Sequence, residues 1–403
     1  MKDNISAIKA ILRIPRECSP RVVWKFIWNF GIRNMINISR FEKRLKRGEP
    51  FFPAFVMISI TESCNLSCSG CWVTHNGKKH LSNKQLGGII SDCKRQGSYF
   101  FGILGGEPFM YSGLMDVLER HKDCYFQIFT NGTLINEEIA LKMRRLGNIT
   151  PFFSIEGLEQ ESALRRGKND VFLRTMEGVR ACRKARLIIG AAASIGKSNY
   201  DDLVNRDYIN MLAKEGVHYL WYYIYRPVGS NPKPENALDK EQIIKLRRLI
   251  VEERKRAPLQ IIDTYWDDLG RAFCPAATGL SHHISPSGAL EFCPPLQMAQ
   301  EFINENGTNT VEQFGKSKFL AELRKLAAET SRGCILLENP EKLVEYLNKQ
   351  DIIDTTTRGN VMQELQAMKA LDGHDQRGEE IEEQNFIYRF LKKKYFFGFG
   401  AYG

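Results

Sequence analysis

The chain has 403 residues, of which 43% are hydrophobic and 26% are charged, and its net charge is +10 at pH 7. The length exceeds what one core usually holds, so we expect a main domain with additional segments. No apolar run reaches the roughly 18 residues of a membrane-spanning helix, and residues 1–19 lack a signal-peptide pattern. We therefore expect a cytoplasmic protein, in which ten cysteines indicate metal ligands or catalysis before disulfides.

Residues 1–50 predict a basic, aromatic helical arm. They carry twelve Lys or Arg against four Asp or Glu, and Trp24, Phe26, Trp28 and Phe30 interrupt the basic residues. Three interpretations stay open. The arm docks on the body of the protein with a solvated basic face, or it contacts an anionic membrane surface, here the inner face of the membrane, or it binds nucleic acid. The docked arm is the most ordinary of the three.

From residue 55 the chain alternates between short apolar runs and amphipathic stretches of helix length. The runs are rich in β-branched and aromatic residues, as strands buried on both faces should be. They cover residues 55–60, 99–104, 125–130, 151–155, 187–195 and 218–225. The helical stretches between them include residues 82–96, 137–146, 171–185 and 239–254. This alternation predicts an α/β fold, a partial (β/α)6 TIM-like barrel at residues 51–256, with its chemistry at the carboxyl ends of the strands.

The pattern changes after Pro258. Cys274, Cys293 and Cys334 follow, with glycines and prolines between them, and predict a small cysteine-containing extension at residues 257–345. Residues 351–385 are polar and predict an exposed linker. We accordingly expect residues 346–403 to be a polar linker followed by a basic, aromatic C-terminal tail.

Cys64, Cys68 and Cys71 form a C-x3-C-x2-C motif directly after the first predicted strand. Three thiolates on one short loop can face one metal centre. A structural zinc site normally takes a fourth protein ligand, and His75 and His80 lie nearby at an unusual spacing. A 4Fe–4S cluster is usually held by four thiolates, so three would leave one iron open to a substrate or cofactor.

This motif, after the first strand of a partial barrel, resembles that of the radical S-adenosylmethionine (radical SAM) superfamily. The resemblance implies a 4Fe–4S cluster on Cys64, Cys68 and Cys71, whose open iron chelates the amino and carboxylate groups of SAM. It also implies reductive cleavage of SAM to a 5′-deoxyadenosyl radical. The electron would come from an external donor of the reduced flavodoxin or ferredoxin type.

Three further stretches match the family at the ends of predicted strands. The sequence GGEP, with Gly105, Gly106 and Glu107, follows the second strand, and the resemblance implies contact with the methionyl amine of SAM. Bare glycines let the backbone approach a ligand closely, and a glutamate can accept hydrogen bonds from an ammonium. The sequence FTNGTL, with Asn131, follows the third strand and adds a cofactor-binding candidate.

The stretch SIEGLEQESALRRG follows the fourth strand. By resemblance, Ser154 is a polar SAM contact, and Arg165 or Arg166 pairs with a carboxylate, although an exposed arginine on a helix is an ordinary alternative. Ser194, at the end of the fifth strand, is a further SAM candidate. The chain has Glu156 where relatives tend to have an aspartate.

One departure from the family concerns the third cysteine. Relatives often carry an aromatic residue just before it, near the adenine, whereas this chain has Gly70 there and Trp72 one place beyond Cys71. Trp72 would either pack near the adenine or belong to the core.

The sequence from Cys274 to Cys293 resembles the start of the SPASM and shorter twitch extensions of radical SAM enzymes. In those, a hairpin with a glycine turn, here at Gly288, brings the first two cysteines together to hold an auxiliary iron–sulfur cluster. Cys334 would be the third ligand, and because no cysteine follows it, we expect a twitch-like unit with one auxiliary cluster. His282 and His283 are candidates for the fourth ligand and also ordinary structural histidines.

These features predict an enzyme that removes a hydrogen atom from an unactivated C–H bond, with the cofactor carrying the hard chemistry. The auxiliary cluster would accept the product electron or anchor the substrate. Tyr223, Tyr225 and Arg226, at the end of the sixth strand, are expected to border the substrate space, and no residue is assigned as a catalytic acid or base. A membrane-associated lipid and a peptide or small molecule are both open as substrates, and nucleic acid rests on charge alone. The competing interpretation is a non-catalytic iron–sulfur electron carrier or binding protein.

Overall fold

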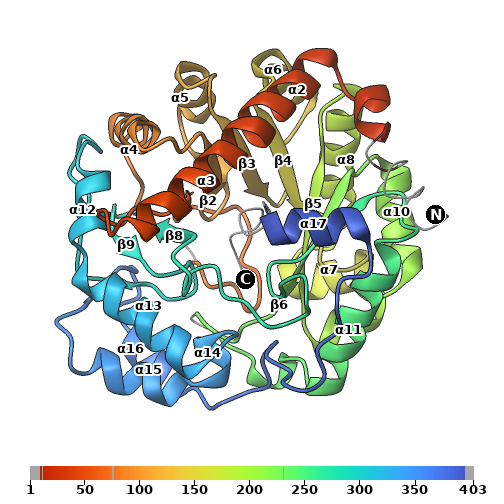
Figure 1. The fold of residues 1–403 in the computed structure, drawn as a ribbon. Coiled ribbons are helices and arrows are strands. Elements are labelled where there is room, and N and C mark those ends of the chain that lie inside the picture. The colour runs from red at the N-terminus through yellow and green to blue at the C-terminus, as the bar shows by residue number, and fades with distance from the viewer. Residues whose placement is uncertain (1–9, 11, 75–76, 230, 395–403) are drawn as a thin grey trace.

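A nine-stranded sheet forms the centre of the protein in the computed structural model, which describes residues 10, 12–74, 77–229 and 231–394 (Figure 1). The strand order is β7-β6-β5-β4-β3-β2-β1-β8-β9, and all neighbours run parallel except β8 and β9. A separate pair, β10 and β11, is antiparallel. The strands are β1 Phe55–Ser59, β2 Phe100–Leu104, β3 Tyr125–Thr130, β4 Ile149–Ser154, β5 Gly190–Ile195, β6 Tyr219–Ile224, β7 Gln260–Ile262, β8 Ser281–Ile284, β9 Leu290–Glu291, β10 Met298–Ala299 and β11 Ile353–Asp354.

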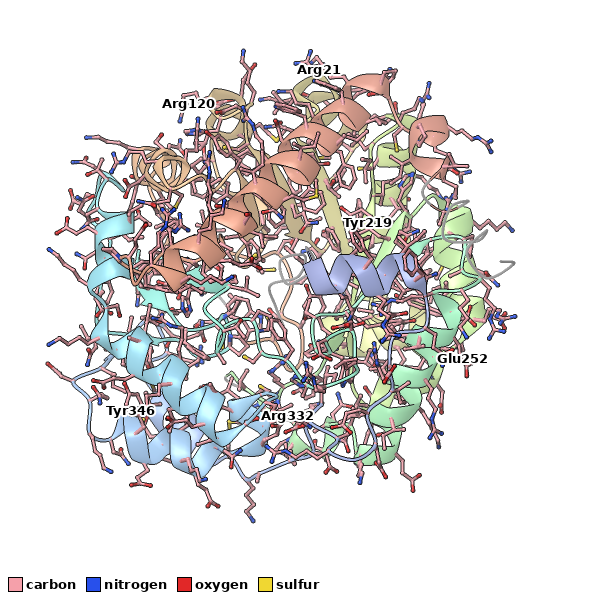
Figure 2. All side chains as sticks on the ribbon, in the orientation of Figure 1. Arg21, Arg120, Tyr219, Glu252, Arg332 and Tyr346 are labelled. Carbon is pink, nitrogen blue, oxygen red and sulfur yellow. The ribbon has the colours of Figure 1, made fainter. Side chains whose placement is uncertain are left out.

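Helices surround this sheet, so Tyr219 of β6 lies inside the molecule, whereas Arg120 and Glu252 lie at its surface (Figure 2). The helices are α2 Pro20–Lys25, the π-helix η1 Phe26–Ile32, α3 Arg33–Lys46, α4 Asn83–Arg95, α5 Leu114–Arg120, α6 Glu137–Leu146, α7 Glu159–Arg166, α8 Val171–Lys184, α9 Tyr200–Leu203, α10 Arg206–Glu215, α11 Lys240–Glu253, α12 Thr310–Lys316, α13 Lys318–Thr330, α14 Ile335–Glu338, α15 Pro340–Leu347, α16 Val361–Gln366 and α17 Phe386–Lys394. Short 3-10 turns are η2 Pro108–Met110, η3 Lys197–Asn199 and η4 Pro234–Asn236.

The six predicted strands and the four predicted helices are confirmed, with ends that differ by three residues at most. Local capping explains the accuracy at the helix ends. Ser82 accepts a hydrogen bond from the backbone of Gln85 at the start of α4, and Asp239 does the same for Gln242 at the start of α11. Gly147, with φ of 76°, ends α6. The parallel α/β architecture is therefore the predicted one, extended by β7 at one edge and by β8 and β9 at the other.

The N-terminal arm packs on the sheet through aromatic side chains. The ring centroid of Phe26 lies 5.6 Å from that of Tyr125, and the centroid of Phe30 lies 4.8 Å from that of Phe100. The docked-arm interpretation is confirmed for these rings. Trp24 and Trp28 stack on each other instead and are 62% and 41% exposed. None of the helices within the described residues combines the length and the apolar character that crossing a membrane requires.

Residues 351–385 are not the exposed linker that their composition predicts. Ile353 and Asp354 pair with β10, and Thr355, His374 and Glu383 are buried. The polarity of the segment misleads because these polar groups find partners inside the protein: Lys79, for example, donates to the carbonyl oxygen of Thr355 at 2.9 Å. Of the predicted basic, aromatic tail, residues 386–394 form α17, whereas residues 395–403 lie outside the described part of the chain.

Asp263, which follows β7, joins the C-terminal helix to the body of the protein. Its fully buried carboxylate pairs with Arg254 and with Arg247 at 3.3 Å, and it accepts a hydrogen bond from Lys392 of α17 at 2.8 Å. Burial alone would raise the pKa of Asp263, but the charges of Lys392, Arg254 and Arg247 hold it well below its usual range. The carboxylate is therefore ionised in the folded protein.

We predict that Asp263→Asn lowers the free energy of unfolding by about 3–5 kcal/mol, because it leaves the buried Arg247 and Lys392 without their counter-ion. Urea unfolding followed by circular dichroism measures this. Since the folded-state pKa of Asp263 is depressed, its contribution to stability is present above the unfolded-state pKa of about 3.9 and is lost as the pH falls below that value. The variant should therefore lose less stability than the wild type on acidification.

The control is Asp116→Asn, which breaks an exposed pair with Lys142 and should change stability by about 0.5 kcal/mol or less. Equal effects of the two substitutions would contradict the role given to Asp263.

Candidate functional site

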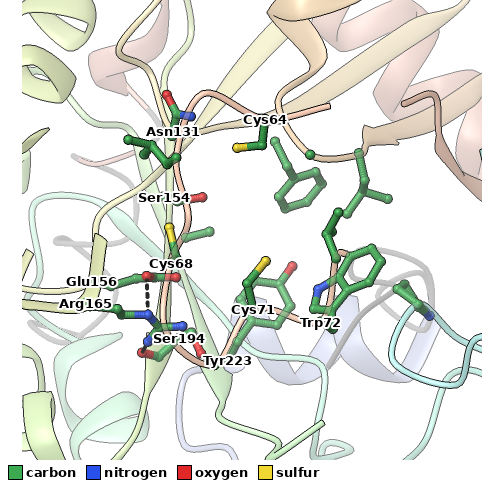
Figure 3. Close-up of a pocket in the computed structure, with 18 of the residues that line it drawn as sticks. Cys64, Cys68, Cys71, Trp72, Asn131, Ser154, Glu156, Arg165, Ser194 and Tyr223 are labelled. Atoms are coloured by element: carbon green, nitrogen blue, oxygen red, sulfur yellow. Dashed lines mark hydrogen bonds and ion pairs between the residues drawn. The ribbon is translucent and has the colours of Figure 1, made fainter. Parts of the chain in front are cut away.

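A cavity of about 260 Å³ opens at the carboxyl ends of the strands (Figure 3). Its walls come from the loop after β1 and from the ends of β2, β3, β4, β5 and β6, as expected for a parallel sheet. The lining residues are Cys64, Leu66, Cys68, Gly70, Cys71, Trp72, Val73, Leu104, Gly105, Gly106, Phe129, Thr130, Asn131, Ser154, Glu156, Arg165, Arg166, Ala192, Ser194, Tyr223, Ile224, Tyr225, Arg226, Val228, Pro294 and Pro295.

The three cysteines of the motif converge on this cavity. The sulfur atoms of Cys64, Cys68 and Cys71 all border it, although the residues lie on a loop without regular structure (Figure 3). Neighbouring elements hold the loop: the amide of Ser69 donates to the carbonyl oxygen of Arg165 at 2.7 Å. Burial raises the pKa of the Cys64 thiol to about 11 and that of Cys71 to about 12. Without a metal, burial therefore keeps these thiols protonated. A bound metal, which requires thiolates, would take the place of the thiol protons.

The three sulfurs face one space, and this arrangement suits the three protein thiolates of a 4Fe–4S cluster, in which each thiolate binds a different iron. His75 lies outside the described residues, and His80 does not line the cavity.

Gly105 and Gly106 bring the end of β2 against the start of the cysteine loop. A Cβ atom on Gly105 would lie 2.5 Å from the carbonyl oxygen of Thr61, and one on Gly106 would lie 2.3 Å from that of Ser63. The amide of Gly106 donates to the oxygen of Thr61 at 2.7 Å. Both glycines line the cavity, so only residues without side chains allow the backbone to lie there.

Glu107 lies beneath the cavity rather than in its wall. The side chain is fully buried and does not line the cavity. Its Oε2 accepts a hydrogen bond from the amide of Asn131 at 2.8 Å, and its Oε1 accepts from Thr130 Oγ1 at 2.8 Å and from the amide of Phe109 at 3.1 Å. The direct ligand contact expected for this carboxylate is therefore not available in this arrangement. Glu107 instead ties the GGEP turn to the end of β3.

The remaining predicted polar residues come from three neighbouring strand ends, at Asn131, Ser154 and Ser194, and from helix α7, which carries Arg165. Asn131, Ser154, Ser194 and Arg165 all line the cavity (Figure 3). The guanidinium of Arg165 forms an ion pair of 2.9 Å with Glu156, the residue that replaces the aspartate of the family. Arg165 therefore already has a carboxylate partner within the chain.

Arg166 is the other arginine considered for a carboxylate. Its Nη2 donates to the carbonyl oxygen of Ser154 at 2.7 Å, and the side chain is almost completely buried. It therefore braces the end of β4.

Gly70 and Tyr225 explain the missing aromatic residue before the third cysteine. Gly70 has φ of 70°, and a Cβ atom there would lie 2.7 Å from the hydroxyl oxygen of Tyr225. The space beside Gly70 is thus filled by Tyr225, which lines the cavity. Trp72 also lines the cavity, and its ring packs edge-on against His283 at 5.9 Å.

All three residues expected at the end of β6 border the cavity. Tyr223 lies on the strand, and Tyr225 and Arg226 follow it. The neighbouring Tyr222 points the other way, because its hydroxyl donates to the carbonyl oxygen of Leu203 at 2.8 Å.

A second, smaller cavity lies beside the first. Cys274, Cys293 and Cys334 line it together with Arg226, whose Nε donates to Cys334 Sγ at 3.0 Å. The predicted hairpin is present: β8 and β9 are antiparallel, and Gly288 lies in the turn with φ of 77°. In each of the two predicted sets, the three cysteines therefore lie around one cavity.

His282 and His283 do not line this second cavity. His282 Nδ1 donates to the carbonyl oxygen of Phe292 at 2.9 Å, and its Nε2 accepts from Arg324 at 3.1 Å. The ring of His283 bonds Glu291 at 2.6 Å and Ser59 at 2.7 Å. Both histidines therefore have structural roles, and the prediction that one of them is the fourth ligand is wrong.

His374 lines the second cavity and was not anticipated from the sequence. The segment around it, DGHDQRGEE, is polar and without periodicity, so no signal in it distinguishes a buried histidine from one in a linker. The other four cysteines are buried and line neither cavity: Cys18, Cys93, Cys124 and Cys182.

Residues 58–205 match a family model described as the Radical SAM superfamily. Fe-coproporphyrin III synthase of Methanosarcina barkeri is 27% identical over 208 residues, which are 50% of this chain and 51% of that protein. The sporulation killing factor maturation protein SkfB of Bacillus subtilis is 23% identical over 263 residues, 62% of this chain and 58% of that protein. The aligned region thus spans little more than half the length of these relatives.

Solved structures share the fold. SuiB of Streptococcus suis bound to S-adenosylmethionine superposes with a TM-score of 0.59 at 20% identity, covering 72% of each chain. The structure of anSMEcpe with bound AdoMet and a peptide superposes with a TM-score of 0.54 at 14% identity, covering 86% of this chain and 96% of that one.

We predict that Glu107→Gln loosens the floor of the first cavity. A glutamine accepts hydrogen bonds at one oxygen only, so some of the donors from Phe109, Thr130 and Asn131 lose their acceptor, at a cost of about 1–3 kcal/mol. Hydrogen–deuterium exchange should speed up in peptides that cover residues 105–110 and 129–133. The matched control is Glu137→Gln on the surface; faster exchange in both variants, or in neither, would refute this role.

Proposed function

Because residues 58–205 form a radical SAM domain, we propose that this protein is a radical SAM enzyme that modifies a peptide or small molecule at an unactivated C–H bond. The observation that carries the proposal is the convergence of three thiols and two bare glycines on one cavity at the strand ends. An iron–sulfur electron carrier would need the thiols but not a cavity of about 260 Å³. The enzyme therefore accounts for more of the site than the non-catalytic alternative.

The family uses a 4Fe–4S cluster and SAM, which together supply a 5′-deoxyadenosyl radical. In this chain Cys64, Cys68 and Cys71 would hold the cluster. Gly105 and Gly106 both line the cavity, and their backbone would face the methionyl end of SAM. A second group of residues supplies polar contacts from neighbouring strand ends and from α7: Asn131, Ser154, Ser194 and, on α7, Arg165.

The walls of the cavity suit a reaction that must exclude water. Much of the lining is apolar, and the apolar residues come from the cysteine loop, from the strands and from the second unit: Leu66, Val73, Leu104, Phe129, Ala192, Ile224, Val228, Pro294 and Pro295. Such walls protect a reactive intermediate from side reactions. Pro294 and Pro295 follow Cys293, so the second unit contributes directly to the first site.

We further propose that Tyr225 takes the place of the aromatic residue missing at position 70 and packs beside the adenine of SAM. Its ring occupies the space next to Gly70 and lies 6.0 Å below the guanidinium of Arg165. An aromatic face at this point offers stacking to a purine.

Cys274, Cys293 and Cys334 are proposed to hold one auxiliary iron–sulfur cluster. Arg226 lines both cavities and donates to Cys334, and a hydrogen bond to a ligating sulfur stabilises the reduced state of a cluster. This arrangement favours a cluster that accepts an electron from the product over one that only anchors the substrate.

The partners follow from this chemistry. A reduced flavodoxin or ferredoxin is the proposed electron donor. SuiB has been solved bound to the precursor peptide SuiA, and SkfB is named as a maturation protein; these relatives favour a peptide here. Phe26 and Phe30 of the arm serve the fold, and none of these relatives points to a lipid, so we do not propose a lipid substrate or a membrane contact.

We predict that Cys71→Ala abolishes formation of 5′-deoxyadenosine from SAM, because the cluster loses a ligand. The assay uses anaerobically reconstituted protein with dithionite and SAM, and chromatography detects the product. The matched control is Cys182→Ala, which removes a buried thiol of α8 that lines neither cavity, and it should keep the activity. Failure of the wild-type protein to make 5′-deoxyadenosine would support the electron-carrier alternative.

We predict that Tyr225→Ala weakens SAM binding about 5- to 30-fold, as the loss of about 1–2 kcal/mol of aromatic contact implies. Tyr225→Phe keeps the ring and should bind SAM nearly as the wild type does. Isothermal titration of the reconstituted protein measures both. Equal weakening by the two substitutions would assign the effect to the hydroxyl, which accepts from the amide of Lys233.

A further inference from the structure

The second cavity presents three thiols, whereas an iron–sulfur cluster usually takes four protein ligands. We infer that His374 is the fourth ligand of the auxiliary cluster, through its Nδ1 atom. The inference rests on the auxiliary cluster proposed above for Cys274, Cys293 and Cys334.

The hydrogen bonds of His374 leave one nitrogen available. The residue is only 2% exposed, and it lines the cavity. Nε2 lies 3.2 Å from the carbonyl oxygen of Phe273. A carbonyl can only accept, so Nε2 carries the proton, and in a neutral imidazole Nδ1 then has a free lone pair.

That lone pair has no hydrogen-bond partner among the described residues. A buried polar atom without a partner is uncommon and costs free energy, so it needs an explanation. A ligated metal supplies one. The opposite nitrogen also has the arrangement typical of metal-binding histidines, which donate their second N–H to a backbone carbonyl. Here that carbonyl belongs to Phe273, the residue before Cys274.

The protein fixes His374 next to Cys334. One carboxylate oxygen of Glu338 accepts from the amide of Cys334 and from the amide of Asp375, each at 3.3 Å. The side chain of Glu338 thereby joins the backbone of one thiol ligand to the backbone beside the histidine. In addition, the amide of Leu371 donates to the carbonyl oxygen of Leu337 at 2.8 Å.

Aromatic neighbours fix the orientation of the ring. The centroid of Tyr265 lies 4.7 Å from that of His374, and Trp266 Nε1 donates to the carbonyl oxygen of His374 at 3.0 Å. A ligand held in this way keeps its geometry without the metal, as a preorganised site requires.

Spectroscopy of the auxiliary cluster alone tests the inference. The full-length protein with Cys64→Ala, Cys68→Ala and Cys71→Ala can assemble a cluster only at the second site. This background is reconstituted anaerobically with iron and sulfide, once with natural histidine and once with ¹⁵N-histidine, and then reduced. Iron and sulfide are counted, and pulsed electron paramagnetic resonance measures the nuclear coupling of nitrogen.

We expect retained iron and a strong coupling that changes on ¹⁵N-histidine labelling. Adding His374→Ala should abolish this coupling. Adding His374→Cys instead should give the iron content of the background but no nitrogen coupling from histidine. The matched control, His121→Gln, also removes a buried histidine whose Nδ1 has no partner in the described part of the chain. It lies outside the cavity and should leave the coupling unchanged.

Two results would overturn the inference in distinguishable ways. Retained iron with no histidine coupling, or coupling that persists in His374→Ala, would refute His374 as the ligand and leave the auxiliary cluster in place. Absence of iron from the triple-alanine background would refute the auxiliary cluster and, with it, the ligand. The labelling result in that background needs no substitution of His374, so it decides the question even if His374→Ala does not fold.

Discussion

The site depends on the close approach of two loops. Gly105 and Gly106 lie directly on the backbone of Thr61 and Ser63, where a methyl group on either glycine would come within 2.5 Å of a carbonyl oxygen. This contact fixes the path of the chain as it leaves β1 toward the cysteines. Glu107 extends the constraint to the end of β3. The cysteine loop can therefore lack regular structure and still present its sulfurs in a defined arrangement, because its supports are rigid.

The elements that the sequence predicted well are those specified by local signals. The strands β1 to β6 are near-continuous apolar runs, and the long helices have capping residues such as Ser82 and Asp239. The cysteine motif and GGEP lie at strand ends, so a parallel sheet was enough to expect them together. Strand β8 was not foreseen as a neighbour of β1, because the pairing of Val56 with His282 joins residues far apart in the chain.

The segment after residue 350 was misinterpreted for a different physical reason. Composition reports polarity but not whether a polar group has a partner, and Thr355, His374 and Glu383 are buried. Glu383 pairs with Arg254, and the backbone of His374 accepts from Trp266. Likewise, Glu107 matched its motif, yet only the structure shows that its oxygens serve the backbone below the cavity. Motifs identify residue types, whereas the direction of a side chain depends on tertiary packing.

The pairing of β8 with β1 also bears on how the chain can be divided. The boundary that composition predicts near residue 257 is crossed by the hydrogen-bonded ladder between Phe55–Ile58 and Ser281–Ile284. A fragment that stopped before β8 would leave one whole side of β1 with unsatisfied amide and carbonyl groups, an edge prone to pair with other molecules. The two sets of cysteines thus share one continuous sheet and are not exchangeable modules. Combining either part with a part of another protein would require redesigning the β1–β8 pairing.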